Sequence, residues 1–224
     1  MPRTSERGGP RTRERIREVA NRLFIERGYD SVTVAEVARE AGVSSVTVFN
    51  HFPRKEDLFL DRSADAADLL RSAVRDRGPG VDVLTALRDT SLRLFDDRHP
   101  LSGVDERSAP FFRTVAESPA LVARAREIAS DLQRILAEEL ERDRAFEGDG
   151  PLLAALFLAG YSSVMVETAR RLIAGQGHSA VLDDHRARLE RLFDALRSGV
   201  TSLASSSDSE KLTSSIIDSV NPNG

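Results

Sequence analysis

Residues 33–52 have the sequence TVAEVAREAGVSSVTVFNHF, and this stretch decides the fold of the N-terminal part of the chain. Thr33 and Glu36 stand three residues apart, as in a capping box, so we expect a helix that begins there and ends at Gly42. Ser44 offers a second N-cap just after that glycine. By propensity the following Ser, Thr and Val residues favour a strand, but caps and tertiary context often override propensity. We therefore predict two short helices joined by a tight Ala-Gly turn.

Three residues of this stretch have the size that a helix-turn-helix requires. Ala38 is small where the two helices cross, Gly42 permits a left-handed turn, and Val48 can pack into the angle between the helices. In such a motif the second helix enters the major groove of DNA, with its N-terminal end toward the base edges. A helix that faces outward needs few large apolar residues, which explains the small hydroxyl residues. The stretch therefore predicts a DNA-binding module.

The second helix and its surroundings also have side chains suited to DNA. Asn50 can pair bidentately with adenine, Val46 can meet a thymine methyl, and Lys55 can reach a phosphate. Hydroxyl donors stand at Ser44, Ser45 and Thr47. Each residue alone has a structural alternative, because Ser and Thr often only cap helices and Asn50-His51 could simply end one. Taken together, the residues favour DNA binding.

The chain of 224 residues divides into four segments. Residues 1–11 are expected to form a flexible basic arm, and residues 12–60 the helix-turn-helix domain, which begins with an amphipathic helix. Residues 61–203 have helical patterns and no strand signal, and one continuous helix is expected over residues 54–77. The Ser-rich segment 204–224 is expected to be a disordered tail or a remnant of recombinant expression. The predicted fold class is all-α, with a three-helix N-terminal domain and a C-terminal helical bundle.

Composition and motifs argue against several functional classes. The chain has no Cys, which excludes disulfides, thiol catalysis and thiolate metal sites. The N-terminus lacks the apolar core of a secretory signal, and the longest apolar stretch, residues 151–166, is too short and mixed to span a bilayer, so we expect a cytoplasmic protein. The four His residues show no zinc-hydrolase spacing, and no phosphate-binding Gly loop or nucleophile elbow occurs. We expect no catalytic residue, no metal and no cofactor.

The last predicted helix, residues 181–203, has an apolar stripe at alternating intervals of three and four residues. The stripe consists of Leu182, His185, Leu189, Leu192, Leu196, Gly199 and Leu203. Such spacing is typical of a coiled-coil seam, although the stripe could instead pack only inside its own subunit. The preceding helix, residues 152–175, is apolar on more than one face. We therefore expect a four-helix interface between two copies, and a homodimer that binds a near-palindromic operator.

Residues 12–60 resemble the DNA-binding domain of the tetracycline-repressor (TetR) family. The resemblance rests on Gly28-Tyr29, Thr33-Val34, Ala41-Gly42-Val43-Ser44, Phe49-Asn50-His51-Phe52 and Lys55. It implies that the DNA-contacting residues are Thr33, Ser44, Ser45, Val46, Thr47, Phe49, Asn50, His51 and Lys55. Phe49 departs from the family pattern, in which a Tyr hydroxyl meets a phosphate. Because it lacks that hydroxyl, Phe49 is expected to pack.

The resemblance also implies that the C-terminal domain binds a small-molecule effector and forms the homodimer. Candidate cavity residues are Phe95, Phe111, Phe112, Arg113, Leu121, Tyr161 and Met165, each of which is also an ordinary core or solvated residue by its type. Arg113 could pair with an anionic group, and residues 111–121 resemble members that bind acyl-CoA-like ligands. The expected effector is therefore acyl-CoA-like or otherwise hydrophobic.

These observations together favour a transcriptional repressor that a small molecule releases from a double-stranded DNA operator. Two alternatives stay open at this point. One is an architectural DNA-binding factor that responds to no effector, which a filled C-terminal core would favour. The other, less favoured, is an α-helical enzyme with an incidental helix-turn-helix.

Overall fold

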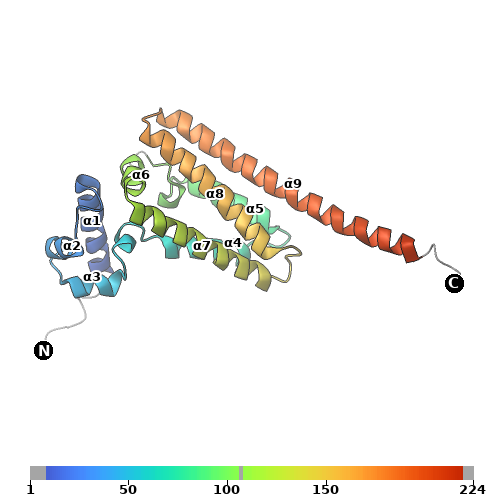
Figure 1. Cartoon of the computed structure of the whole chain (residues 1–224), viewed down its shortest axis with the longest axis horizontal. Coiled ribbons are helices and arrows are strands. Elements are labelled where there is room, and N and C mark those ends of the chain that lie inside the picture. The colour runs from blue at the N-terminus through green and yellow to red at the C-terminus, as the bar shows by residue number, and fades with distance from the viewer. Residues whose placement is uncertain (1–8, 106–107, 219–224) are drawn as a thin grey trace.

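The computed structural model describes residues 9–105 and 108–218, with side chains up to Gly199. Within these ranges all regular structure is helical, which confirms the all-α prediction. Figure 1 shows a small N-terminal unit beside a larger helical body, from which the last helix projects. The elements are α1 (Pro10–Arg27), α2 (Val34–Glu40), α3 (Ser45–His51), η1 (Glu56–Leu58), α4 (Ser63–Arg75), α5 (Val83–Asp96), η2 (Pro100–Ser102), α6 (Ser108–Glu117), α7 (Pro119–Arg142), α8 (Gly150–Ile173) and α9 (His178–Asp218).

The caps of α2 and α3 form as the sequence predicts. The Thr33 hydroxyl accepts a hydrogen bond from the Glu36 amide (3.2 Å), and the Glu36 carboxylate accepts one from the Thr33 amide (2.8 Å). The Ser44 hydroxyl accepts from the Thr47 amide at 3.0 Å. Gly42 has φ 65°, the left-handed region that a side chain would disfavour. The helix-turn-helix prediction is therefore confirmed for α2 and α3.

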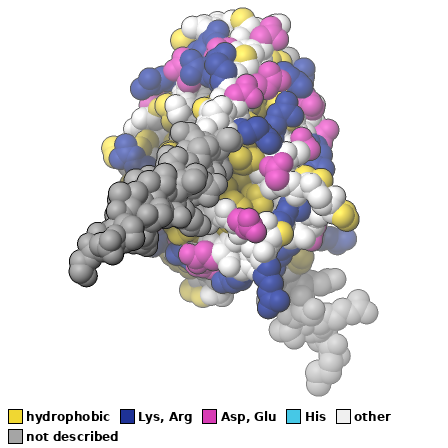
Figure 2. All heavy atoms as spheres, turned by 90° about the vertical axis from the view of Figure 1, so that its right-hand side faces the viewer, with side chains coloured by type: hydrophobic (Ala, Val, Ile, Leu, Met, Phe, Trp, Pro, Cys, Tyr) yellow, Lys and Arg dark blue, Asp and Glu magenta, His cyan; other side chains and the backbone are white. Residues whose placement is uncertain are grey.

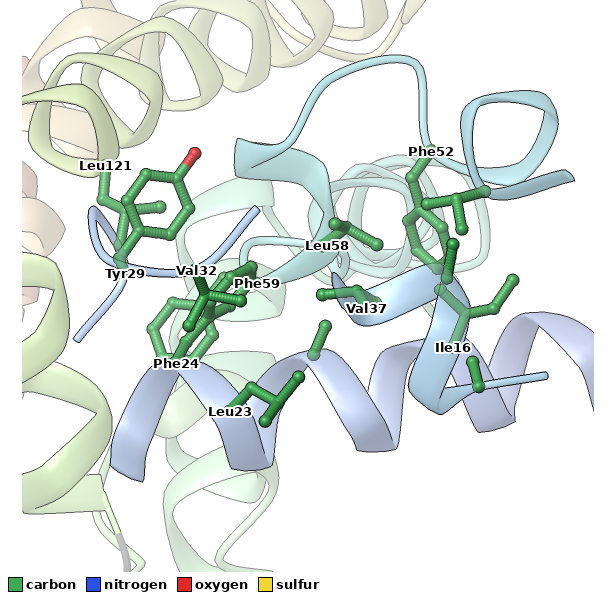
Figure 3. Close-up of a cluster of buried hydrophobic side chains, with 14 residues drawn as sticks. Ile16, Leu23, Phe24, Tyr29, Val32, Val37, Phe52, Leu58, Phe59 and Leu121 are labelled. Atoms are coloured by element: carbon green, nitrogen blue, oxygen red, sulfur yellow. The ribbon is translucent and has the colours of Figure 1, made fainter. Parts of the chain in front are cut away.

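A continuous apolar core joins the three N-terminal helices to the body (Figure 3). Phe24 packs on Tyr29 with ring centroids 5.0 Å apart, and edge-on against Phe59 at 5.8 Å. Leu121, from α7 in the body, is fully buried in the same cluster and lies beside Tyr29 in Figure 3. Leu121 therefore belongs to the junction between the two parts.

The prediction of one continuous helix over residues 54–77 is wrong, because the chain forms the 3-10 turn η1 and a new helix, α4, begins at Ser63. The carboxylate of Asp57 accepts a hydrogen bond from the Arg54 amide at 3.2 Å, which starts the short turn. Leu58 and Phe59 are both buried in the N-terminal core, and Phe59 stacks on Phe111 of α6 at 4.7 Å. Tertiary packing of these two neighbours outweighs the local helical pattern.

Helix α8 is a core helix of the body. Its 24 residues make it long and apolar enough, by length and composition alone, to cross a membrane. The apolar stretch expected from the sequence, residues 151–166, is therefore shorter than the helix that forms. In the fold, however, α8 packs between α7 and α9 and buries Leu153, Phe157 and Leu158. An apolar helix of this kind is expected at the centre of a helical bundle.

Most of the apolar stripe of α9 packs inside the chain. His185, Leu189 and Leu196 are 1%, 0% and 6% exposed. Gly160 of α8 permits this close packing, since a Cβ atom there would lie 2.2 Å from Cδ1 of Leu192. The interpretation of these residues as an inter-subunit seam is therefore wrong, and the internal alternative holds for them. Gly199 is exposed, and the side chain of Leu203 lies outside the described part.

The ends of the chain differ in part from the predicted segments. Helical backbone continues to Asp218, beyond the expected end near residue 203, and the sequence has no Gly or Pro between residues 204 and 218 to stop it. Residues 219–224 of the expected tail lie outside the described residues. So do residues 1–8 of the expected basic arm, and α1 begins at Pro10.

Burial of His185 predicts a loss of stability between about pH 6.5 and pH 4. Thr168 donates its hydroxyl proton to the Val164 carbonyl (3.0 Å), so its oxygen accepts from Nδ1 of His185 (2.8 Å), and the ring also stacks on Phe95. Burial lowers the pKa of His185 to about 4, whereas the unfolded side chain has a pKa of about 6.5. In this window the unfolded chain binds the proton first, so the free energy of unfolding falls by about 3 kcal/mol toward pH 4.

The measurement is the free energy of unfolding by urea at several pH values. His185→Leu should flatten the profile between pH 6.5 and 4 relative to the wild type, whatever its effect on absolute stability. An unchanged slope in this variant would show that carboxylates alone produce the acid dependence.

Candidate DNA-binding surface and ligand cavity

Helix α3 is anchored by one face and exposed on the other. Val48 is 1% exposed and packs in the N-terminal core, whereas Val46 is 69% exposed. Asn50 and Ser44 are exposed, and Ser45, Thr47 and His51 are half-buried at its flanks. The structure thus brings the predicted residues of α3 together on one outward surface, which we call the α3 face (residues 44–47 and 49–51).

Phe49 does not pack, contrary to expectation. Its side chain is 49% exposed. Successive residues of an α-helix point about 100° apart, so burial of Val48 turns Phe49 toward solvent. The α3 face therefore presents two apolar side chains, Val46 and Phe49, next to its polar groups.

Two predicted hydroxyl groups already have partners within the protein. The Thr33 hydroxyl donates to the Glu36 carboxylate at 2.8 Å, and the Ser44 hydroxyl lies 2.9 Å from the Thr47 hydroxyl. Each also caps its helix. These two side chains therefore position the helices. Because the Thr33 hydroxyl already donates its proton to the Glu36 carboxylate, that proton is not available to a phosphate in this arrangement.

Lys55 bonds within the protein as well. Its ammonium donates to the Tyr29 carbonyl at 2.7 Å and lies 4.0 Å from the centroid of the Tyr29 ring. Burial lowers the pKa of Lys55. An ammonium has three donors, so a phosphate could take another, but the lysine's first role here is to fasten the segment before η1 to the α1–α2 connection.

A cavity of about 780 Å³ opens in the body and reaches the N-terminal unit. Four of the predicted residues line it: Phe111, Phe112, Tyr161 and Met165. Its wall is mostly apolar, and burial raises the pKa of Tyr161 to about 12, so this phenol stays neutral. Gly103 has φ 66°, and a Cβ atom there would lie 2.5 Å from Cε of Met165 and 2.7 Å from Cζ of Phe112. The wall is therefore tightly fitted at this point.

The other three predicted residues lie elsewhere. Leu121 is in the N-terminal core, Phe95 stacks on His185 at 5.4 Å, and Arg113 is exposed to solvent outside the cavity wall. The sequence pattern missed the contribution of α1 to the wall, where Arg17 and Asn21 take part. The position of these two polar residues next to the apolar side of an amphipathic helix could have indicated that they line a cavity. No group of three or more His, Asp or Glu in the described part could hold a metal ion.

Comparison with known proteins places the helix-turn-helix in a family. Residues 16–61 match the family model described as bacterial regulatory proteins, tetR family. The helix-turn-helix segment of the chain thus matches the TetR family. The matched residues include α2 and α3 and end just after η1, so the family match coincides with the helix-turn-helix unit of the fold.

Similar curated proteins carry names of transcriptional regulators. The chain is 31% identical over 136 residues to the HTH-type transcriptional regulator TcmR of Streptomyces glaucescens, covering 57% of this chain and 59% of the relative. It is 35% identical over 78 residues to the HTH-type transcriptional repressor AcnR of Corynebacterium diphtheriae, covering 35% and 41%. These matches thus span less than two thirds of either relative.

Solved structures share the fold over most of the chain. NalD of Pseudomonas aeruginosa, described as the secondary repressor of the MexAB-OprM multidrug efflux pump, has a TM-score of 0.56 at 19% identity, covering 86% of this chain and 98% of NalD. A TetR-family regulator from Streptomyces coelicolor has a TM-score of 0.53 at 21% identity, covering 84% and 97%. At such identities the likeness concerns the TetR fold alone.

Proposed function

We propose that this TetR-family chain is a DNA-binding transcriptional regulator, most simply a repressor, that a small molecule releases from its operator. The observation that carries the proposal is one chain holding both an outward α3 face and a cavity of about 780 Å³ that touches the N-terminal unit. An open cavity argues against an architectural factor with a filled core. The names of AcnR and NalD as repressors support the direction of the response.

The mechanism we propose is a shift between two conformations. The cavity wall includes residues of α1 and α4 together with the body, so a bound molecule can favour one placement of the N-terminal unit over another. In a two-fold dimer, DNA affinity depends on the distance between the two α3 faces, because successive major grooves lie one helical turn apart. A small change in that distance would release the operator. The protein would act in the cytoplasm, where its operator lies.

We also propose that the homodimer forms through α8. Leu152, Leu156 and Val166 of α8 are 41%, 48% and 53% exposed, and their spacing places them along one stripe of the helix. Figure 2, which faces the end of the body where α8 begins, shows hydrophobic side chains exposed among charged ones. Exposed apolar stripes of this kind are typical of interfaces.

Leu156→Ala is expected to raise the dimer dissociation constant about tenfold, since truncation of an interface leucine costs about 1–2 kcal/mol. Sedimentation velocity over a range of concentrations measures this change. Leu101→Ala, at the cavity wall, is the matched control and should leave the dimer unchanged. A wild-type dissociation constant for Leu156→Ala would place the interface elsewhere.

Binding-site selection from random duplex DNA, at two salt concentrations, tests the proposed function. The expected product is a near-palindrome with half-sites about one helical turn apart, bound more weakly at the higher salt concentration. Selection of no sequence would refute the proposal. If a palindrome is selected but no hydrophobic small molecule changes its affinity, the regulator is one without an effector.

A further inference from the structure

The wall of the cavity is shared between the body and the DNA-binding unit. Arg17 and Asn21 of α1 line it, together with apolar residues of the body such as Leu87, Leu132 and Phe157. Helix α1 also belongs to the core that holds α2 and α3 in place. A molecule in the cavity therefore touches the unit that carries the α3 face directly.

The amide oxygen of Asn21 is buried and accepts no hydrogen bond from any described residue. A buried acceptor without a partner is unfavourable for the free protein. Asn21 lines the cavity, and a donor group of a bound molecule that reaches this oxygen would supply the missing hydrogen bond. The rest of the wall is mostly apolar, so this oxygen would fix the orientation of an otherwise apolar molecule.

The charged groups at this end of the cavity favour a donor over an anion. Arg17 is paired with Glu14 and lies 3.7 Å from the Asp61 carboxylate, and Arg62 pairs with Asp65 at 3.3 Å. Both guanidinium groups at this end are thus already neutralised by carboxylates. The Asp61 carboxylate, which these arginines approach, is 9% exposed and is a second acceptor at this end, and burial raises its pKa. An anionic group placed here would face Asp61 and the amide oxygen of Asn21.

We propose that the cavity takes an amphipathic molecule with an apolar body and a hydrogen-bond-donating head, and that the head donates to the amide oxygen of Asn21. The inference rests on the proposed function only in assigning the molecule the role of effector. The bound molecule then bridges α1 of the DNA-binding unit and the helices of the body. It acts on DNA affinity through this bridge, because occupancy favours the arrangement in which the head and the apolar body are both in contact.

Matched probes of equal size test the chemistry of the head. 1-Decanol and 1-methoxynonane are isomers, and only the alcohol has a donor; decylammonium and decanoate add a positive and a negative head. Isothermal titration calorimetry should give about tenfold tighter binding for 1-decanol than for 1-methoxynonane, with decanoate weaker than 1-decanol. Decylammonium should bind at least as tightly as the alcohol if the head is cationic, and more weakly if it is neutral.

Asn21→Leu locates the head within the cavity. This near-isosteric change removes the acceptor, so the preference for 1-decanol over 1-methoxynonane should disappear. The apo variant should be at least as heat-stable as the wild type, because a buried acceptor without a partner has been removed. Thr90→Val, a polar-to-apolar change in the wall formed by α5, is the matched control and should keep the preference.

Three results would overturn the proposal. One is an unchanged preference for 1-decanol in Asn21→Leu, and another is its loss in Thr90→Val. The third is binding of decanoate tighter than 1-decanol, particularly if Arg98→Gly abolishes it, since the Arg98 guanidinium lines the wall. Operator binding by the free variants is measured separately, so failure of the proposed function and failure of this inference give different outcomes.

Discussion

Val46→Glu is expected to reduce operator affinity about 100-fold or more while leaving the protein as stable as the wild type. Val46 is the most exposed large apolar residue of the α3 face, at 69%. A carboxylate there would approach the bases and phosphates of the groove, and a like charge at an interface costs several kcal/mol. In a two-fold dimer the substitution acts twice. Stability should not fall, because α3 gains an acidic residue in its first turn, where the helix dipole favours it.

Fluorescence anisotropy with the selected operator measures the affinity, and thermal denaturation measures the stability. Ile25→Glu is the matched control, since Ile25 is 46% exposed on α1, outside the α3 face. The control receives the same charge change and should lose much less affinity. Equal losses in both variants would mean that net charge alone weakens binding, and the proposed orientation of α3 would be refuted.

Local signals in the sequence were sufficient to predict the helix-turn-helix. The capping box at Thr33, the turn at Gly42 and the cap at Ser44 depend on residues three or four apart, so a short stretch contains all the information. The exposure of the α3 face follows from the same pattern, because Val48 alone points inward. Even the error at Phe49 was one of family analogy, since helical periodicity by itself turns that residue outward.

Contacts between distant segments could not be predicted in the same way. The break at η1 depends on Phe59 meeting Phe111, which lies 52 positions later in the chain. The placement of Lys55 depends on a carbonyl that only the folded α1–α2 connection presents. The cavity requires helices from the whole chain, and a pattern of apolar residues does not distinguish a wall from a filled core.

The apolar stripe of α9 is another case in which the sequence pattern did not identify the packing partner. Its spacing of three and four residues is equally suited to a partner helix within the chain and to one in a second copy. The structure gives the internal answer for His185 and Leu189, because α8 approaches closely at Gly160. A spacing pattern identifies an apolar face, whereas the identity of its neighbour depends on tertiary structure.

Leu121→Ala is expected to lower the free energy of unfolding by about 2–5 kcal/mol, the usual cost of deleting a fully buried leucine side chain. This loss is large against the 5–15 kcal/mol that stabilises a typical domain. Leu121 begins its helix in the body but is 0% exposed inside the N-terminal core, near Tyr29 and Phe59. The cavity left by the substitution therefore lies at the junction, and α1–α3 should loosen more than the body.

Amide hydrogen exchange distinguishes a junction from an ordinary core position. In Leu121→Ala, exchange in α1–α3 should become faster while the centre of α8 keeps its protection relative to global unfolding. Ile25→Ala, a truncation at an exposed position, should change stability by less than about 0.5 kcal/mol. Equal acceleration in α3 and α8 would mean that the two parts unfold as one unit. A localised effect would identify Leu121 as the contact through which the body and the DNA-binding unit stabilise each other.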